Sequence, residues 1–182
     1  VTVDITDDAT TEAFERFGLD LSNASGATIL DGHADAIIGA SDAVAVAQPR
    51  ISVSDMTVGE ADGYVDIVVS LSAPGQNEVK VNFTYSNHPA VNGIDYGGLA
   101  STLTFAPGET AKTVVVAIAD DTAAEGPEQF FLNLSNASGA TILKGQGVAT
   151  IGASDAPAVA QPRISMQNAI VGEGDGYVDV VV

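Results

Sequence analysis

The chain has 182 residues, 46% of them hydrophobic, and its 24 acidic and 6 basic residues give a formal net charge of −18. Nucleic acids and anionic membranes both require basic protein surface, so neither is expected as a partner. The hydrophobic content predicts a folded chain, because acidic disordered segments are poor in apolar residues. The sequence has no cysteine, which excludes disulfides and thiolate metal sites. It also has no apolar run of the roughly 20 residues that a membrane-spanning helix needs.

The chain repeats itself at an offset of 113 residues, since FGLDLSNASGATIL at 17–30 returns as FFLNLSNASGATIL at 130–143. A period of this size is typical of a domain and exceeds that of a solenoid repeat. In chain order, the repeat predicts five segments. They are the last three strands of one module (1–42), a connector (43–50), a complete module (51–155), a second connector (156–163) and the first two strands of a further module (164–182).

Short segments of alternating apolar and polar residues follow one another through the complete module. Alternation with a period of two predicts strands that bury one face. We expect strands within 51–58, 64–72, 79–85, 103–105, 114–118, 130–134 and 147–154. About seven short strands separated by turn sequences predict an all-β, immunoglobulin-like antiparallel sandwich, here in tandem. Without cysteine or tryptophan, its core must consist of Val, Ile, Leu and Phe.

Each connector is short and rich in small residues, AVAVAQPR at 43–50 and APAVAQPR at 156–163. Alanine, valine and proline in this mixture predict an extended and fairly stiff spacer, unlike a glycine-serine tether. Neighbouring modules of the same chain are therefore the first partners to expect.

One predicted loop concentrates acidic residues. Asp120, Asp121, Glu125 and Glu128 fall within 120–128, and the first copy keeps the same spacing. The four acids of that copy are Asp7, Asp8, Glu12 and Glu15. Carboxylates this close repel each other unless cations neutralise them, and Ca²⁺ takes six to eight oxygen ligands. The alternative is an ordinary solvated surface loop.

Several motifs in order give the module a specific resemblance. They are LTFAPGET at 103–110, the Asp120-Asp121 pair, EGPEQF at 125–130 and LSN at 134–136. In these stretches the module resembles the Calx-β domain, a repeat of sodium–calcium exchangers and of large bacterial surface proteins.

The resemblance implies a cluster of Ca²⁺ ligands at one end of the sandwich. The matching positions are Glu60, Asp95, Asp120, Asp121, Glu125, Glu128 and Asp155, and by repeat equivalence Asp7, Asp8, Glu12, Glu15, Asp42 and Glu173. The family often ends in consecutive aspartates, whereas here Ala156 and Pro157 follow Asp155. That departure predicts fewer or more weakly held ions.

The function that these features favour is structural rather than enzymatic. We expect a calcium-rigidified repeat of a long extracellular bacterial protein, such as an adhesin stalk or surface filament. An alternative is a filament subunit whose incomplete terminal modules complement those of other copies head to tail. A less favoured alternative is a module that binds carbohydrate or a host ligand. Such a module would need exposed aromatic residues, whereas the aromatic content is 5% and there is no tryptophan. A cytosolic calcium sensor is disfavoured by the tandem copies and the shortened terminal acid run.

Overall fold

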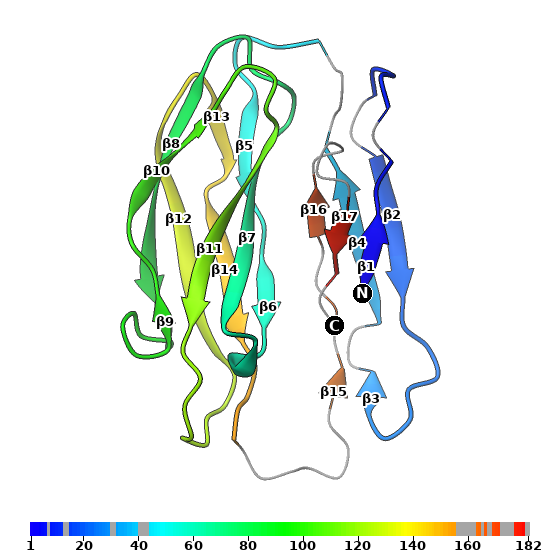
Figure 1. Ribbon diagram of the computed structural model, residues 1–182, viewed down its shortest axis with the longest axis vertical. Coiled ribbons are helices and arrows are strands. Elements are labelled where there is room, and N and C mark those ends of the chain that lie inside the picture. Colours follow the sequence, from blue (N-terminus) through cyan, green and yellow to red (C-terminus); the bar gives the residue numbers. More distant parts are fainter. Residues whose placement is uncertain are drawn as a thin grey trace.

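The computed structural model describes residues 1–6, 8–12, 15–29, 32–39, 44–155, 163–164, 166, 169–171 and 177–180 (Figure 1). Its elements are β1 (Thr2–Asp4), β2 (Glu15–Asp20), β3 (Thr28–Ile29), β4 (His33–Ile38), β5 (Arg50–Val53), β6 (Met56–Val58), η1 (Glu60–Asp62), β7 (Tyr64–Leu71), β8 (Val79–Asn87), β9 (Tyr96–Gly97), β10 (Ser101–Phe105), β11 (Ala111–Ile118), β12 (Glu128–Ser138), β13 (Thr141–Lys144), β14 (Gln146–Ile151), β15 (Arg163–Ile164), β16 (Ala169–Val171) and β17 (Tyr177–Asp179). The one helical element in these ranges is the short turn η1, so no helix there could cross a membrane.

The complete module is a sandwich of two five-stranded sheets, which confirms the predicted all-β, immunoglobulin-like fold. One sheet has the order β10-β8-β12-β14-β6 and the other the order β13-β5-β7-β11-β9. Alternate residues of the long strands point into the core; in β7, for example, Val65, Ile67, Val69 and Leu71 are buried. The fully buried aromatic side chains are Tyr96, Phe105 and Phe130. Burial of these apolar faces holds the sheets together.

The prediction of a single strand across 51–58 was wrong, because the chain changes sheet at Ser54 and Asp55. β5 pairs with β7 and β13 in one sheet, whereas β6 pairs with β14 in the other. The buried Ser54 hydroxyl accepts a hydrogen bond from Val68 N and donates to Val68 O, both at 3.1 Å. Asp55 Oδ1 accepts from Val148 N at 2.9 Å. The two side chains thus accept from the Val68 and Val148 N–H groups at the break in the ladder, while Val68 O also accepts from Ser54 N at 2.9 Å.

Both halves of this divided first strand run parallel to a strand from the end of the module. Ile51 of β5 lies opposite Ile142 of β13. In the other sheet, Met56 and Val58 of β6 lie opposite Ala149 and Ile151 of β14. The remaining strand pairs of the sandwich are antiparallel.

A second, smaller group of strands forms from the two terminal segments of the chain and lies beside the sandwich (Figure 1). β1 pairs with β17, β3 with β15, and β4 lies between β2 and β16. The registers repeat those of the complete module at the offset of 113: Ala36 lies opposite Ala169 as Ala149 lies opposite Met56. These segments therefore pair with each other within one chain and build part of a second module. Head-to-tail pairing between chains stays a prediction.

The described part of the first connector is hydrogen-bonded to the complete module that follows it. Val46 N donates to Pro74 O at 2.8 Å, and Gln76 N donates to Val46 O at 2.9 Å. The Gln76 side chain adds a bond from Nε2 to Ala45 O at 3.0 Å. These bonds lie at the end of the sandwich where β5 begins, opposite the end where β14 finishes (Figure 1).

Candidate metal centre

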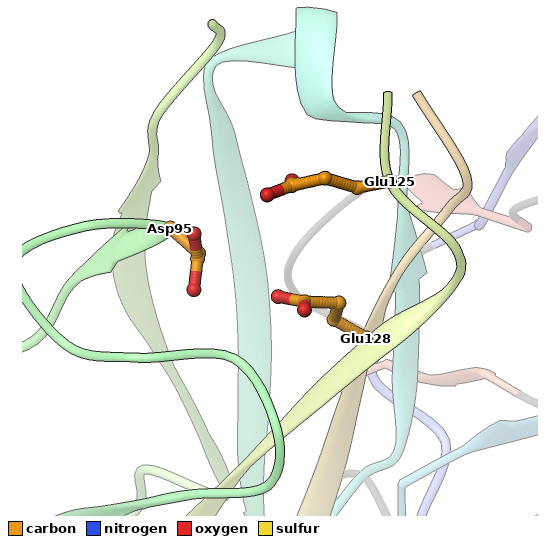
Figure 2. A group of neighbouring side chains, drawn as sticks. All are labelled: Asp95, Glu125 and Glu128. Carbon is orange, nitrogen blue, oxygen red and sulfur yellow. The ribbon is translucent and has the colours of Figure 1, made fainter. Parts of the chain in front are cut away.

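Three of the predicted site residues meet at one end of the complete module. Asp95 lies in the loop before β9, Glu125 in the loop before β12, and Glu128 is the first residue of β12. Each side chain is partly buried, and one carboxylate oxygen from each lies within 4.8 Å of the other two. Figure 2 shows the three side chains converging on one space from separate segments. This spacing would let a single cation contact all three.

The Asp95 loop is held by its own hydrogen bonds. Asp95 Oδ2 accepts from Val91 N at 2.6 Å. Two hydrogen bonds between Asn92 and Gly98 close the loop. Asn92 Nδ2 donates to Gly98 O at 2.7 Å, and Gly98 N donates to Asn92 Oδ1 at 3.1 Å. The next residue, Tyr96, is buried and stacks on Phe130 with ring centroids 4.0 Å apart and an angle of 11°. The aromatic pair anchors Asp95 next to the start of β12.

The position of Glu125 is fixed through its main chain. Glu125 and Ser154 form an isolated antiparallel bridge, with Glu125 N donating to Ser154 O at 3.0 Å and Ser154 N donating to Glu125 O at 3.3 Å. Ser154 belongs to the segment that follows β14. The acidic loop is thus tied directly to the stretch that leads out of the module.

Glu60 supplies a fourth carboxylate and is the most deeply buried acid of the site. Its side chain is 7% exposed; Oε1 accepts from Asp121 N at 3.1 Å, while Oε2 is buried without a hydrogen-bond partner. A buried, unsatisfied carboxylate oxygen is costly unless a cation compensates it. Glu60 lies in η1, where Asp62 Oδ2 accepts from Gly59 N at 2.8 Å. Asp62 thus closes the turn that carries Glu60.

The carboxylates perturb each other electrostatically. Burial, followed by the charge of Asp121, raises the pKa of Glu125, and the charges of Asp95, Glu60 and Asp155 add to the effect. Burial, followed by the charge of Asp95, likewise raises the pKa of Glu128. Raised carboxyl pKa values mean that the ionised forms are disfavoured at this end of the module. A bound divalent cation would reverse that preference, so the donor set fits a hard oxygen-seeking ion such as Ca²⁺.

The other predicted ligands of the complete module lie around this group. Asp121 is exposed and accepts a hydrogen bond from Ala123 N to Oδ1 at 2.6 Å. Asp155 is exposed with a positive φ of 45°, and its charge acts on Glu125. Asp120 is exposed and does not belong to the group of three carboxylates. The structure therefore brings Asp95, Glu125 and Glu128 together, with Glu60, Asp121 and Asp155 as neighbours.

The repeat-equivalent acids are only partly described. Asp8, Glu12 and Glu15 line one cavity in the smaller strand group. Thr10 N donates to Asp8 Oδ1 at 2.6 Å, which lowers the pKa of Asp8 and matches the turn that Asp121 forms. Asp7, Asp42 and Glu173 lie outside the described residues.

Comparison with known families identifies the repeat. The Calx-beta domain family matches this chain over residues 1–43 and 42–157. The chain belongs to the Calx-beta domain family. This confirms the resemblance drawn from the motifs at 103–110 and 120–136.

Two relatives are far larger than this chain. Extracellular matrix protein 3 of Lytechinus variegatus is 35% identical over 138 residues, which is 72% of this chain and 4% of that protein. Adhesion G-protein coupled receptor V1 of Danio rerio is 32% identical over 84 residues, which is 46% of this chain and 1% of that receptor. The chain thus spans a small fraction of the length of either relative.

Solved structures support the fold. The apo-form Calx CBD1 domain aligns with a TM-score of 0.54 and 23% identity, covering 58% of this chain and 96% of that domain. The calcium binding domain CBD12 of CALX1.1 aligns with a TM-score of 0.56 and 24% identity, covering 58% of this chain and 45% of that protein. At these identities the likeness establishes the architecture of the Calx-beta module.

Proposed function

We propose that the complete module binds Ca²⁺ at the end where Asp95, Glu125 and Glu128 converge, with Glu60 as a buried fourth ligand. The observation that carries the proposal is the Glu60 Oε2 atom, which is buried without a hydrogen-bond partner among mutually repelling carboxylates. Structural likeness to a protein described as a calcium binding domain supports it. Asp120, Asp121 and Asp155 remain candidate outer ligands, and Ca²⁺ can use water for coordination sites that the protein leaves open.

The consequence of binding would be mechanical. Without a cation, the acids at this end repel each other and favour an open arrangement of their loops. A bound ion would join the Asp95 loop, η1 and the acidic loop. Because Glu125 is bridged to Ser154, the ion would also order the segment that leads to the next connector.

We infer a structural role for the chain as an extracellular calcium-stiffened repeat. The similarity to an adhesion receptor and to an extracellular matrix protein supports this setting. A stalk or surface filament of a bacterium is the specific context we propose, with neighbouring repeats as partners. Nothing in the chemistry of the site calls for catalysis, so we assign it no enzymatic activity.

Calcium titration of the chelator-treated chain tests the proposal. We expect saturable calorimetric binding and a rise in melting temperature, since a ligand at 100 times its dissociation constant stabilises the native state by about 2.7 kcal/mol. Glu128→Gln should weaken binding, because it removes one converging carboxylate. Glu78→Gln is the matched control, as Glu78 forms an exposed ion pair with Lys80 away from the cluster. Unchanged melting and no calorimetric heat on adding calcium would rule the site out.

A further inference from the structure

Asn92 is the one asparagine of the sequence that is followed by glycine; the others precede Ala, Glu, Phe, His or Leu. An Asn-Gly pair is chemically labile, because glycine has no side chain to shield its main-chain nitrogen from the neighbouring amide. The Gly93 nitrogen can attack Cγ of Asn92, which forms a cyclic imide and releases Nδ2, together with the Gly93 proton, as ammonia. Water then opens the ring to aspartate or isoaspartate. In an unfolded chain, Asn92 is therefore the asparagine that deamidates fastest.

In the folded loop, both reacting groups are engaged in hydrogen bonds. Gly93 N donates to Tyr96 O at 2.7 Å, in a backbone with a positive φ of 88°. The leaving group, Asn92 Nδ2, donates to Gly98 O at 2.7 Å, and Asn92 Oδ1 accepts from Gly98 N at 3.1 Å. Ring closure requires the Gly93 nitrogen to turn from Tyr96 O toward Cγ of Asn92, and it requires Nδ2 to leave Gly98 O. The closed loop therefore opposes the reaction.

The reactive pair is exposed, whereas the groups that hold it are buried. Asn92 and Gly93 lie at the surface, where water can reach them. Tyr96 is 1% exposed, and Gly98 is buried so close to Tyr85 that a Cβ at this glycine would lie 2.7 Å from Cδ2 of the ring. The acceptors at 96 and 98 are thus fixed by the core. The pair can react only when its segment opens locally away from them.

The same opening would displace Asp95. Its side chain and its main chain both bond to Val91, with Val91 N donating to Asp95 Oδ2 at 2.6 Å and Asp95 N donating to Val91 O at 3.0 Å. A cation shared by Asp95, Glu125 and Glu128 would hold the loop closed. At 100 times the dissociation constant, an opening that releases the ion becomes about 100-fold rarer. This link to calcium rests on the proposed function, whereas the hydrogen bonds that hold Asn92 do not.

We propose that Asn92 is a deamidation site that the closed loop protects and that loss of calcium exposes. Aspartate at this position accepts from Gly98 N but cannot donate to Gly98 O, so one of the two bonds that close the loop is lost. Isoaspartate adds a main-chain carbon between positions 92 and 93. Either product loosens the loop that carries Asp95. Returning calcium does not reverse the reaction, so a repeat that has stood without calcium remains altered.

Mass spectrometry of the full chain tests this site, because the tryptic peptide 81–112 contains Asn82, Asn87 and Asn92 together. The chain is incubated in mildly alkaline buffer with calcium, with chelator, or with chelator and urea, and fragment ions locate each conversion of amide to acid. Conversion should fall on Asn92. It should be at least about tenfold slower in chelator than in urea, and at least about tenfold slower again in saturating calcium. Asn92→Gln should abolish it, because glutamine must close a larger ring.

Calorimetry on the same samples separates this proposal from the proposed function. If calcium binds but the rate at Asn92 stays the same, the link to calcium is overturned and the metal site stands. If calcium gives no heat, the metal site fails, and the ratio of rates in chelator and urea still decides whether the loop protects Asn92. Equal rates in those two conditions, or equally fast conversion at Asn82 or Asn87, overturn the site itself.

The effect of the product on the loop is measured separately. Asn92→Asp should speed amide hydrogen exchange at 91–98, because the donor to Gly98 O is missing. Exchange in β12 should change little, since that strand is paired on both sides. Unchanged exchange at 91–98 would contradict the loosening of the loop.

Discussion

Replacing Glu60 by glutamine should change the stability of the module in opposite directions with and without calcium. In the structure, Glu60 is 7% exposed, Oε1 accepts from Asp121 N, and Oε2 has no hydrogen-bond partner. Leaving a buried polar group unsatisfied costs about 1–3 kcal/mol. Glutamine keeps an acceptor for Asp121 N and places an amide donor, without charge, among the neighbouring carboxylates. In chelator, the variant should therefore be more stable than the parent by about that amount.

This difference is large enough to measure. For a domain of 60–100 residues, each kcal/mol shifts the melting temperature by about 4–8 °C, so scanning calorimetry in chelator should show a clear rise. In saturating calcium the order should reverse, because the variant has lost a charged ligand. Glu78→Gln should leave both melting temperatures nearly unchanged, as exposed ion pairs contribute little. If Glu60→Gln lowers the melting temperature in chelator, the assignment of Oε2 as an uncompensated buried oxygen is incorrect.

Two further predictions concern pH and the sheet change. In chelator, the pKa values of Glu125 and Glu128 in the native state are raised above the ordinary value of 4.5. At pH values between 4.5 and these raised values, the native state therefore binds protons that the unfolded state does not. The unfolding free energy should therefore increase as pH falls through that window and should lose this contribution above it; melting across a pH series checks the sign, and a decrease would contradict it. Ser54→Ala should cost about 1–3 kcal/mol in urea denaturation, because it removes both hydrogen bonds of the Ser54 hydroxyl and leaves Val68 N without its acceptor. Ser101→Ala, at an exposed serine, is the control. An equal loss of unfolding free energy in both variants would show that the hydrogen bonds of the Ser54 hydroxyl do not stabilise the module.

The strands that the sequence predicted best are those with one buried face. Alternation across 64–72 and 114–118 corresponds to β7 and β11, since burial of every second side chain leaves a period of two in the sequence. β13 was not predicted because all four of its residues are exposed and carry no alternation. The change of sheet at Ser54 was also missed, because it depends on a hydrogen bond to Val68 that local pattern does not encode.

The candidate site was predictable in composition but not in arrangement. Spacing and family motifs marked the acids, yet the partner of Glu60 is the main chain of Asp121, 61 residues away. Only the fold brings those two segments together. The sequence also did not distinguish the two adjacent acids Asp120 and Asp121. In the structure, the charge of Asp121 raises the pKa of Glu125, and Asp121 N donates to Glu60 Oε1. Which of two neighbouring side chains faces a site depends on backbone direction at the end of β11.

The parallel pairing of β6 with β14 determines how the module would respond to tension. Because the chain enters at one end of the sandwich and leaves at the other, pulling on its two ends would slide β6 along β14 instead of peeling one from the other (Figure 1). The hydrogen bonds of that ladder would then share the load and have to break together. β5 and β13 repeat the arrangement in the second sheet. A repeat built this way resists extension along its own axis, which is the direction of force on a chain anchored at one end and gripped at the other.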